Sequence, residues 1–130
     1  MKKLLTTLLL SIIFLTTGKA QNLIGSSLRD AHKILDEKGY IIQKGYTDDN
    51  VYYITAADNE SVRIYYFSSN NICVMFAISY KGFTYTEIKQ ILNKAGYWQV
   101  NDQFYTNDYK ATIIYMNEYE CYFVVVIPRL

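Results

Sequence analysis

Two stretches of the chain, GSSLRDAHKILDEKGY at residues 25–40 and GFTYTEIKQILNKAGY at residues 82–97, follow one pattern. Both contain Gly-x-(Ser/Thr)-x-x-(Asp/Glu), then Ile-Leu, then Gly-Tyr. A hydroxyl side chain followed three residues later by an acid is typical of a helix N-terminus. A glycine after the last apolar turn is typical of a helix C-terminus. Because Leu28, Ala31 and Leu35 fall on one helical face, the first stretch predicts an amphipathic helix, and the second repeats it.

Strand-like segments follow each of these helices. They are rich in Tyr, Ile and Val, and clusters of Asn, Asp and Ser that favour turns separate them. The first helix is followed by segments at 40–46, 51–56, 61–67 and 72–80, and the second by segments at 98–106, 109–116 and 121–127. The first half is longer, so we expect it to hold one extra or one longer strand.

The sequence therefore predicts an α+β fold of two repeated units, residues 25–80 and 82–127. Each unit would consist of one helix and an antiparallel meander of three or four strands. A helix must bury its apolar stripe, and the nearest apolar surface is a face of the sheet. We expect a single domain over residues 21–130, with both helices packed on one face of the sheet and the other face partly open.

The glycine-led pattern, followed by aromatic-rich strands, resembles a known fold. The beta-lactamase-inhibitor protein and the small outer-membrane assembly lipoproteins of the SmpA/OmlA type share it, and the resemblance covers residues 25–127 in outline. It implies a tandem pair of helix-plus-sheet units that offers an aromatic-rich sheet surface to a target protein. The lipid-modified cysteine of the lipoproteins is absent from this sequence, which argues against that branch.

Residues 1–20 have the features of a bacterial secretory signal. Lys2 and Lys3 precede an apolar run from Leu4 to Leu15, and small residues stand at the end of the segment, up to Ala20. The apolar run is shorter than the roughly 20 residues that a membrane-spanning helix needs. We predict cleavage after Ala20, export to the periplasm or the extracellular space, and no membrane span in the mature chain. The alternative is a retained membrane anchor.

Charge argues against a nucleic-acid partner. The full chain has 13 basic and 12 acidic residues, a formal net charge of +1. Three of the lysines belong to the predicted signal, so the mature chain keeps ten basic residues against all 12 acidic ones, a net charge of −2. A weakly acidic exported protein lacks the electrostatic attraction that binds nucleic acid.

No sequence pattern points to catalysis, a cofactor or a metal. His32 is the single histidine, and we predict a solvated helix residue rather than a base or a metal ligand, because no second ligand stands one turn away. Asp48, Asp49 and Asn50 could hold calcium, but their spacing fits a hairpin turn better. A glycine-rich phosphate loop and a nucleophile elbow are both absent from the sequence. We expect no enzyme activity.

The two cysteines, Cys73 and Cys121, occupy corresponding positions in the two predicted units. Each stands near the start of the last predicted strand. In an oxidising compartment they would form a disulfide if these strands meet about a pseudo-twofold axis. The other interpretation is two buried free thiols, because cysteine packs as a small apolar residue.

Tyrosine is the unusual feature of the composition, with 14 residues in the chain. Successive side chains of a strand point to opposite faces, and we expect Val62 and Ile64 to face the helices. The candidate partner-binding residues, expected on the open face, are Tyr53, Arg63, Tyr65, Phe67, Tyr105 and Tyr115. Aromatic and arginine side chains are typical of protein-recognition surfaces. A high strand propensity of tyrosine is the alternative explanation.

Together these features predict an exported, non-catalytic binding module. Its expected partner is another protein, either an enzyme that it inhibits or a component of the cell envelope, recognised through the aromatic open face. One alternative is a periplasmic carrier of a small ligand, and another is an enzyme whose site no motif reveals. A continuous exposed aromatic patch would favour the protein partner, whereas a closed apolar pocket would favour the carrier.

Overall fold

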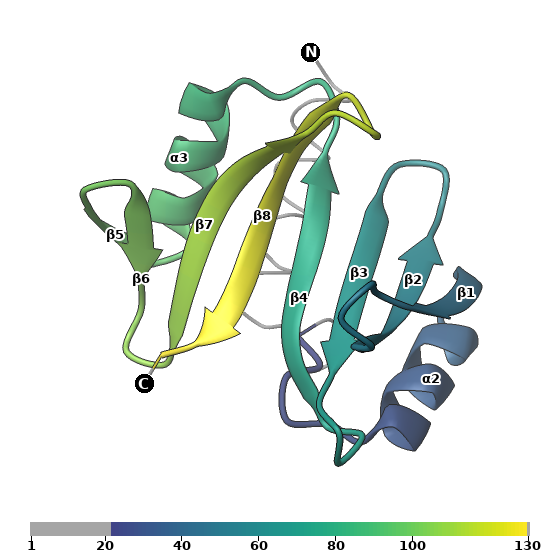
Figure 1. The fold of residues 1–130 in the computed structure, drawn as a ribbon. Coiled ribbons are helices and arrows are strands. Elements are labelled where there is room, and N and C mark those ends of the chain that lie inside the picture. The colour runs from purple at the N-terminus through teal and green to yellow at the C-terminus, as the bar shows by residue number, and fades with distance from the viewer. Residues whose placement is uncertain (1–21, 130) are drawn as a thin grey trace.

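The computed structural model describes residues 22–129, so the predicted signal peptide at 1–20 lies outside the described residues. The described chain forms two helices and one eight-stranded sheet in which all neighbouring strands are antiparallel (Figure 1). This confirms the predicted α+β class with an antiparallel sheet. In chain order the elements are α2 (Leu28–Glu37), β1 (Ile41–Tyr46), β2 (Tyr52–Ala57), β3 (Val62–Phe67), β4 (Cys73–Tyr80), α3 (Tyr85–Lys94), β5 (Trp98–Val100), β6 (Gln103–Tyr105), β7 (Tyr109–Met116) and β8 (Cys121–Pro128).

The strand order across the sheet is β1-β2-β3-β4-β8-β7-β6-β5. Strands β1 to β4 therefore fill one half, strands β5 to β8 fill the other in reverse, and β4 pairs with β8 in the middle (Figure 1). The prediction of one strand over residues 98–106 is wrong. Asn101 adopts a positive φ of 55° and turns the chain between β5 and β6, so each half of the described sheet has four strands.

Both helices begin and end where the sequence predicts. The Ser27 hydroxyl accepts the N–H of Asp30 at 3.1 Å at the start of α2. At the start of α3, the Thr84 hydroxyl accepts the N–H of Glu87 at 3.2 Å, and the Glu87 carboxylate accepts the N–H of Thr84 at 2.9 Å. The glycine that follows each helix adopts a positive φ, 80° after α2 and 93° after α3, which a residue without Cβ accepts readily.

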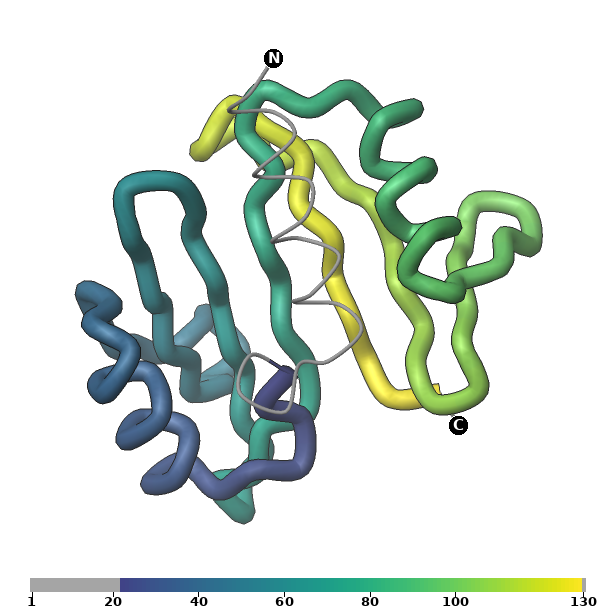
Figure 2. Tube along the Cα trace, turned by 180° about the vertical axis from the view of Figure 1, so that it is seen from behind, coloured from purple at the N-terminus to yellow at the C-terminus, as the bar shows by residue number. Residues whose placement is uncertain are grey.

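The two helices lie on the same side of the sheet, one over each half (Figure 2). We call this side the helix-covered face and the other side the open face. The main core lies on the helix-covered face, where Leu35 of α2 and Ile88 of α3 are fully buried with strand residues such as Ile54 and Phe104. Burial of these apolar side chains provides most of the driving force for folding.

Tyr65 and Phe67 belong to this main core, with 0% and 2% of their surface exposed. The prediction that they lie on the open face is therefore wrong, and Val62 and Ile64 point to the open face instead. Strand β3 carries apolar or aromatic side chains on both faces, so alternation alone does not show which face meets the helices.

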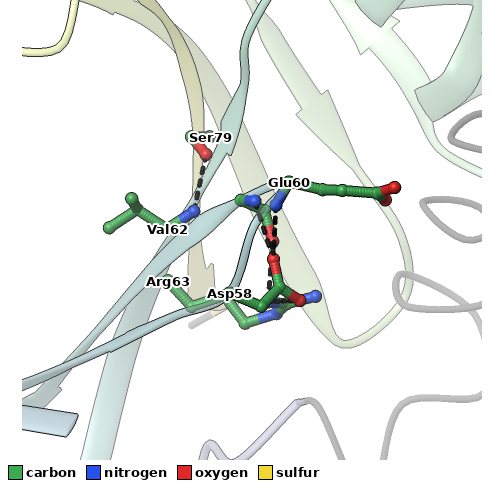
Figure 3. A network of polar contacts seen from close by, with 6 residues as sticks. Asp58, Glu60, Val62, Arg63 and Ser79 are labelled. Atoms are coloured by element: carbon green, nitrogen blue, oxygen red, sulfur yellow. Dashed lines mark hydrogen bonds and ion pairs between the residues drawn. The ribbon is translucent and has the colours of Figure 1, made fainter. Parts of the chain in front are cut away.

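Arg63 shares the helix-covered face with Tyr65, although the sequence suggested an exposed position. Its guanidinium stacks on the Tyr40 ring, 4.6 Å from the centroid, and lies 3.7 Å from the Asp58 carboxylate. It also donates to the Ser61 hydroxyl at 2.7 Å. Figure 3 shows the polar contacts of Arg63 and Asp58 at the turn between β2 and β3. Only 12% of the Arg63 side chain is exposed, and these contacts compensate for the loss of water around its charge, so the arginine has a structural role.

Cys73 and Cys121 are both free and buried, so the disulfide that the sequence allowed as one of two alternatives does not form. Cys73 lies on the helix-covered face at the start of β4, whereas Cys121 lies on the open face. Because Tyr122 pairs with Tyr80 at the far end of β4, about eight strand residues or ~25 Å separate the two cysteines. A disulfide requires Cα atoms within about 7 Å, so the interpretation as two buried thiols holds.

Candidate binding groove

The open face carries a second set of apolar and aromatic side chains, from alternate positions of the strands. Tyr53 of β2 and Tyr66 of β3 are direct cross-strand partners there, and their ring centroids lie 6.3 Å apart. Both rings are half-buried. No described helix covers this side of β2 and β3 (Figures 1 and 2). The two tyrosines are therefore available for contact with another molecule.

A groove with a volume of about 740 Å³ runs along this face, between strands β1 to β3 and the turn that joins β7 to β8. Its strand side is formed mainly by alternate open-face residues, and its other side by the turn. The residues that line it are Ile41, Gln43, Lys44, Thr47, Tyr53, Thr55, Ala57, Val62, Ile64, Tyr66, Met116, Asn117, Glu118 and Tyr119. Most of this lining is aliphatic or aromatic, with hydroxyl, amide and charged groups at the sides.

The sheet beside the groove has a small core of its own. Ile64, Ala77, Cys121 and Phe123 are buried on the open face, with Phe123 fully inaccessible. Tyr119, from the turn between β7 and β8, folds back so that its ring centroid lies 5.1 Å from that of Phe123. This ring contact packs the β7–β8 turn against the sheet. The side of the groove that the turn forms is therefore stabilised by packing.

Gly45 of β1 sets the position of Tyr53. The two residues are cross-strand partners, and a Cβ atom on Gly45 would lie 2.6 Å from the Tyr53 hydroxyl oxygen and 2.8 Å from ring carbon Cζ. Only a glycine leaves room for the tyrosine ring to lie across β1 in this way. The ring therefore covers the backbone of the edge strand and forms part of the groove lining.

The environment of the groove favours the neutral form of Tyr66. Burial raises the pKa of Tyr66, and the neighbouring Tyr119, Tyr53 and Glu118 raise it further. The hydroxyl stays protonated at neutral pH and can donate a hydrogen bond to a bound group. Within the described part of the chain, no cluster of His, Cys, Asp and Glu could hold a metal ion. The arrangement is suited to holding apolar side chains and to hydrogen bonding at its sides.

The structure separates the six residues predicted to bind a partner. Tyr53 lies in the groove, and Tyr105 lies on the open face in the other half of the sheet. Arg63, Tyr65 and Phe67 belong to the helix-covered face. Tyr115 is 52% exposed, but its ring packs on that of Tyr122, which contacts the main core.

The other polar candidates do not belong to the groove lining. His32 is on α2, near Lys44 and Tyr52. Asp48 and Asp49 form a turn that ends at Asn50, which has a positive φ of 65°. The Thr47 N–H donates to the carbonyl oxygen of Val51, and Thr47 accepts the N–H of Asn50 at its carbonyl oxygen and the N–H of Val51 at its hydroxyl. The structure thus places a hairpin turn where the sequence also allowed a calcium site.

Sequence reasoning missed Tyr66, Met116 and Tyr119, which belong to the groove. The expectation that Val62 and Ile64 face the helices also places Tyr66 there by alternation, whereas all three lie on the open face. Met116 and Tyr119 flank a turn, and their approach to β3 depends on how far the β7–β8 turn bends over the open face. The tyrosine next to that turn was a usable signal, because exposed aromatic residues on loops often serve recognition.

Comparisons with protein-family models, curated proteins and solved structures gave no match to this chain. Within residues 22–129, neither helix is long and apolar enough to span a membrane.

Proposed function

We propose that the mature protein is an exported, non-catalytic binding module whose groove receives apolar side chains of a protein partner. The observation that carries this proposal is the groove itself, about 740 Å³ in volume and lined by tyrosines and aliphatic side chains. Exposed aromatic surface of this kind is typical of recognition sites. The N-terminal sequence supports export, because residues 1–20 have the features of a secretory signal.

The edge strand β1 favours a macromolecular partner over a small ligand. Ile41, at the start of β1, lines the groove and is 71% exposed, so the groove continues to an unpaired edge of the sheet. A carrier would enclose most of its ligand. An open groove beside an exposed strand edge suits a partner that covers both.

We further propose that the two halves are copies of one unit, residues 25–80 and 82–127, arranged as in the inhibitor-like fold. Each half consists of a capped helix followed by four antiparallel strands. The glycine that opens each unit, Gly25 and Gly82, has a positive φ of 92° and 85° respectively. These correspondences at aligned positions support duplication of one unit.

The test is partner capture with the mature chain, residues 21–130, as bait for envelope and culture-medium fractions. We expect one dominant protein in the mass spectra, and we expect the double variant Tyr53→Ala/Tyr66→Ala to lose it. Tyr46→Ala is the matched control, because Tyr46 is 68% exposed and stands on the opposite face of the same strand pair. Capture that survives the double variant would contradict the proposal.

Two further measurements, native mass spectrometry and N-terminal sequencing, complete this test. A small molecule that co-purifies with the protein in native mass spectra, without a protein partner, would support a carrier instead. N-terminal sequencing of exported material should begin at Gln21, and an intact Met1 would overturn the cleavage prediction.

A further inference from the structure

The open face carries a second cluster, in the half of the sheet away from the groove. Trp98, Tyr105, Lys110 and Ile127 are direct cross-strand partners in one row across β5, β6, β7 and β8. Directly opposite residues of a sheet project to the same face, with Cβ atoms about 5 Å apart. Two aromatic rings and the lysine side chain therefore stand side by side.

Arg129 adds a second cation to this row. Its guanidinium carbon lies 5.5 Å from the centroid of the Trp98 ring and 5.2 Å from that of Tyr105. The backbone N–H of Arg129 donates to the carbonyl oxygen of Asp108 at 2.8 Å, and Nη1 of its side chain donates to the carbonyl oxygen of Thr106 at 3.1 Å. Two rings and one hydrogen bond hold the guanidinium, and the other hydrogen bond holds the Arg129 backbone.

Among the described residues, neither Lys110 nor Arg129 forms an ion pair with an acidic side chain. Between residues 22 and 129 the structure contains one ion pair, between Arg63 and Asp58. Arg129 uses one of its five side-chain N–H donors in the hydrogen bond to Thr106. Two unpaired cations beside Tyr105 repel each other, and this occurs in a mature chain whose net charge is −2. The row is therefore a local positive site on a weakly acidic protein.

We propose that the row Trp98-Tyr105-Lys110 with Arg129 binds a carboxylate side chain on an acidic segment of the protein partner. A stacked guanidinium presents its N–H groups at its edge, and this geometry matches a carboxylate in a bidentate pair. The exposed ring of Trp98, with 44% of its surface accessible, adds apolar contact beside the charge. This inference rests on the proposed function, because it assumes that the partner binds to the open face.

The simpler role for Arg129 is structural: its side chain would pack the segment that follows β8 against the β5–β6 hairpin. That role needs the stacking and the two hydrogen bonds, but no affinity for anions. The two explanations differ in what a peptide with carboxylates does to Trp98. Trp98 is the single tryptophan of the chain, so all of the tryptophan fluorescence reports on this cluster.

The experiment titrates the mature protein with acetyl-(Ser-Glu)₃-amide at low ionic strength and follows the emission of Trp98. We expect a saturable change that acetyl-(Ser-Gln)₃-amide does not produce. Raising the salt concentration from about 0.02 M to about 0.2 M should weaken the interaction, because partly exposed charges are screened. The same response to both peptides, or no response to either, would overturn the proposal and leave the structural role.

Variants sharpen this result. Arg129→Gln and Lys110→Gln should each weaken binding of the glutamate peptide by about fivefold, the usual scale of one exposed ion pair. Lys89→Gln is the control, because Lys89 lies 5.7 Å from the centroid of the Tyr85 ring, in a cation–aromatic pair on α3. Circular dichroism should show that all three variants stay folded. Unchanged affinity in a folded Arg129→Gln variant would contradict the proposal.

The titration needs no natural partner, so its failure is distinct from failure of the groove. Partner capture that depends on Tyr53 and Tyr66 would stand even if the acidic peptide does not bind. Conversely, if the groove captures no partner, peptide binding that depends on Arg129 would still demonstrate an anion-binding site.

Discussion

Tyr65 and Tyr66 are neighbours in the sequence and have opposite environments in the structure. Tyr65 has no exposed surface and lies in the core under the helices, where its ring centroid is 5.9 Å from that of Phe76. Tyr66 is half-buried on the open face, in the wall of the groove. One residue of β3 thus supports the fold, and the next is available to a partner.

This contrast extends to both faces of the sheet. The helix-covered face buries large side chains from the strands and both helices, among them Leu35 and Ile91. The open face buries a smaller set and leaves tyrosines and aliphatic groups at the surface of the groove. The same residue types therefore contribute to stability on one face and are free for recognition on the other, and only the face tells them apart.

The largest expected effect tests this contrast at β3. Tyr65→Ala should lower the free energy of unfolding by about 3–5 kcal/mol, the usual cost of removing a buried aromatic side chain. Tyr66→Ala should cost about 1 kcal/mol, because much of its ring already contacts water. Urea unfolding of a chain that spans residues 21–130 measures both values. Equal losses in the two variants would show that the faces do not differ in this way.

The helices and most strand positions could be predicted from the sequence. Caps and glycines gave the helix ends correctly, because local hydrogen bonds such as that between Ser27 and Asp30 decide them. The split of residues 98–106 into β5 and β6 was missed. Its turn depends on the positive φ of Asn101, and a single asparagine is a weak signal for a turn.

The groove was harder to predict, because the sequence of β3 alone does not show which of its two sets of alternate side chains faces the helices. Ile64, Tyr65, Tyr66 and Phe67 are all apolar or aromatic, so both registers bury an acceptable set. A charged residue such as Arg63 is usually exposed. Here Arg63, near the start of β3, contacts Tyr40 and Asp58 and lies on the helix-covered face. Tyr40 precedes β1, and a pattern within β3 does not reveal a contact with a residue of another segment.

A second prediction compares the two cysteines, which lie on opposite faces. Burial raises the pKa of the Cys73 thiol to about 11, above its ordinary value of 9.0. The folded state keeps this proton to higher pH than the unfolded chain does. Stability is therefore complete below pH 9 and declines as the pH rises toward 11, by at most about 1.4 kcal/mol per pH unit from this group.

Urea midpoints between pH 8 and pH 10 measure this decline. Cys73→Ala should flatten it, because the variant has no thiol to ionise on unfolding. Burial also raises the pKa of Cys121, while a hydrogen bond to the backbone of Tyr80 and the charge of Lys81 act in the opposite direction. Cys121→Ala should therefore remove less of the decline. The same pH dependence in Cys73→Ala and the unmodified chain would contradict the assignment.

The smallest expected effect on stability concerns Gly45, where β1 meets the ring of Tyr53. In Gly45→Ala the new Cβ would approach the tyrosine hydroxyl oxygen to 2.6 Å, so the ring must move. The ring is the far end of a flexible side chain, and alanine restricts the unfolded chain, so we expect a change in unfolding free energy below about 1 kcal/mol. The groove should nevertheless change shape. Nuclear Overhauser contacts between the Tyr53 and Tyr66 rings, whose centroids lie 6.3 Å apart, should weaken.

Partner capture then connects this shape to recognition. If the position of Tyr53 matters, Gly45→Ala should bind the partner as weakly as Tyr53→Ala does, and combining the two substitutions should add nothing, since both act through one ring. A Gly45→Ala variant that loses the contacts between the Tyr53 and Tyr66 rings but still captures the partner fully would show that binding does not require the position of Tyr53. The open face would then depend on Tyr66 and on the β7–β8 turn, and its role in recognition would belong to the middle of the sheet rather than to its edge.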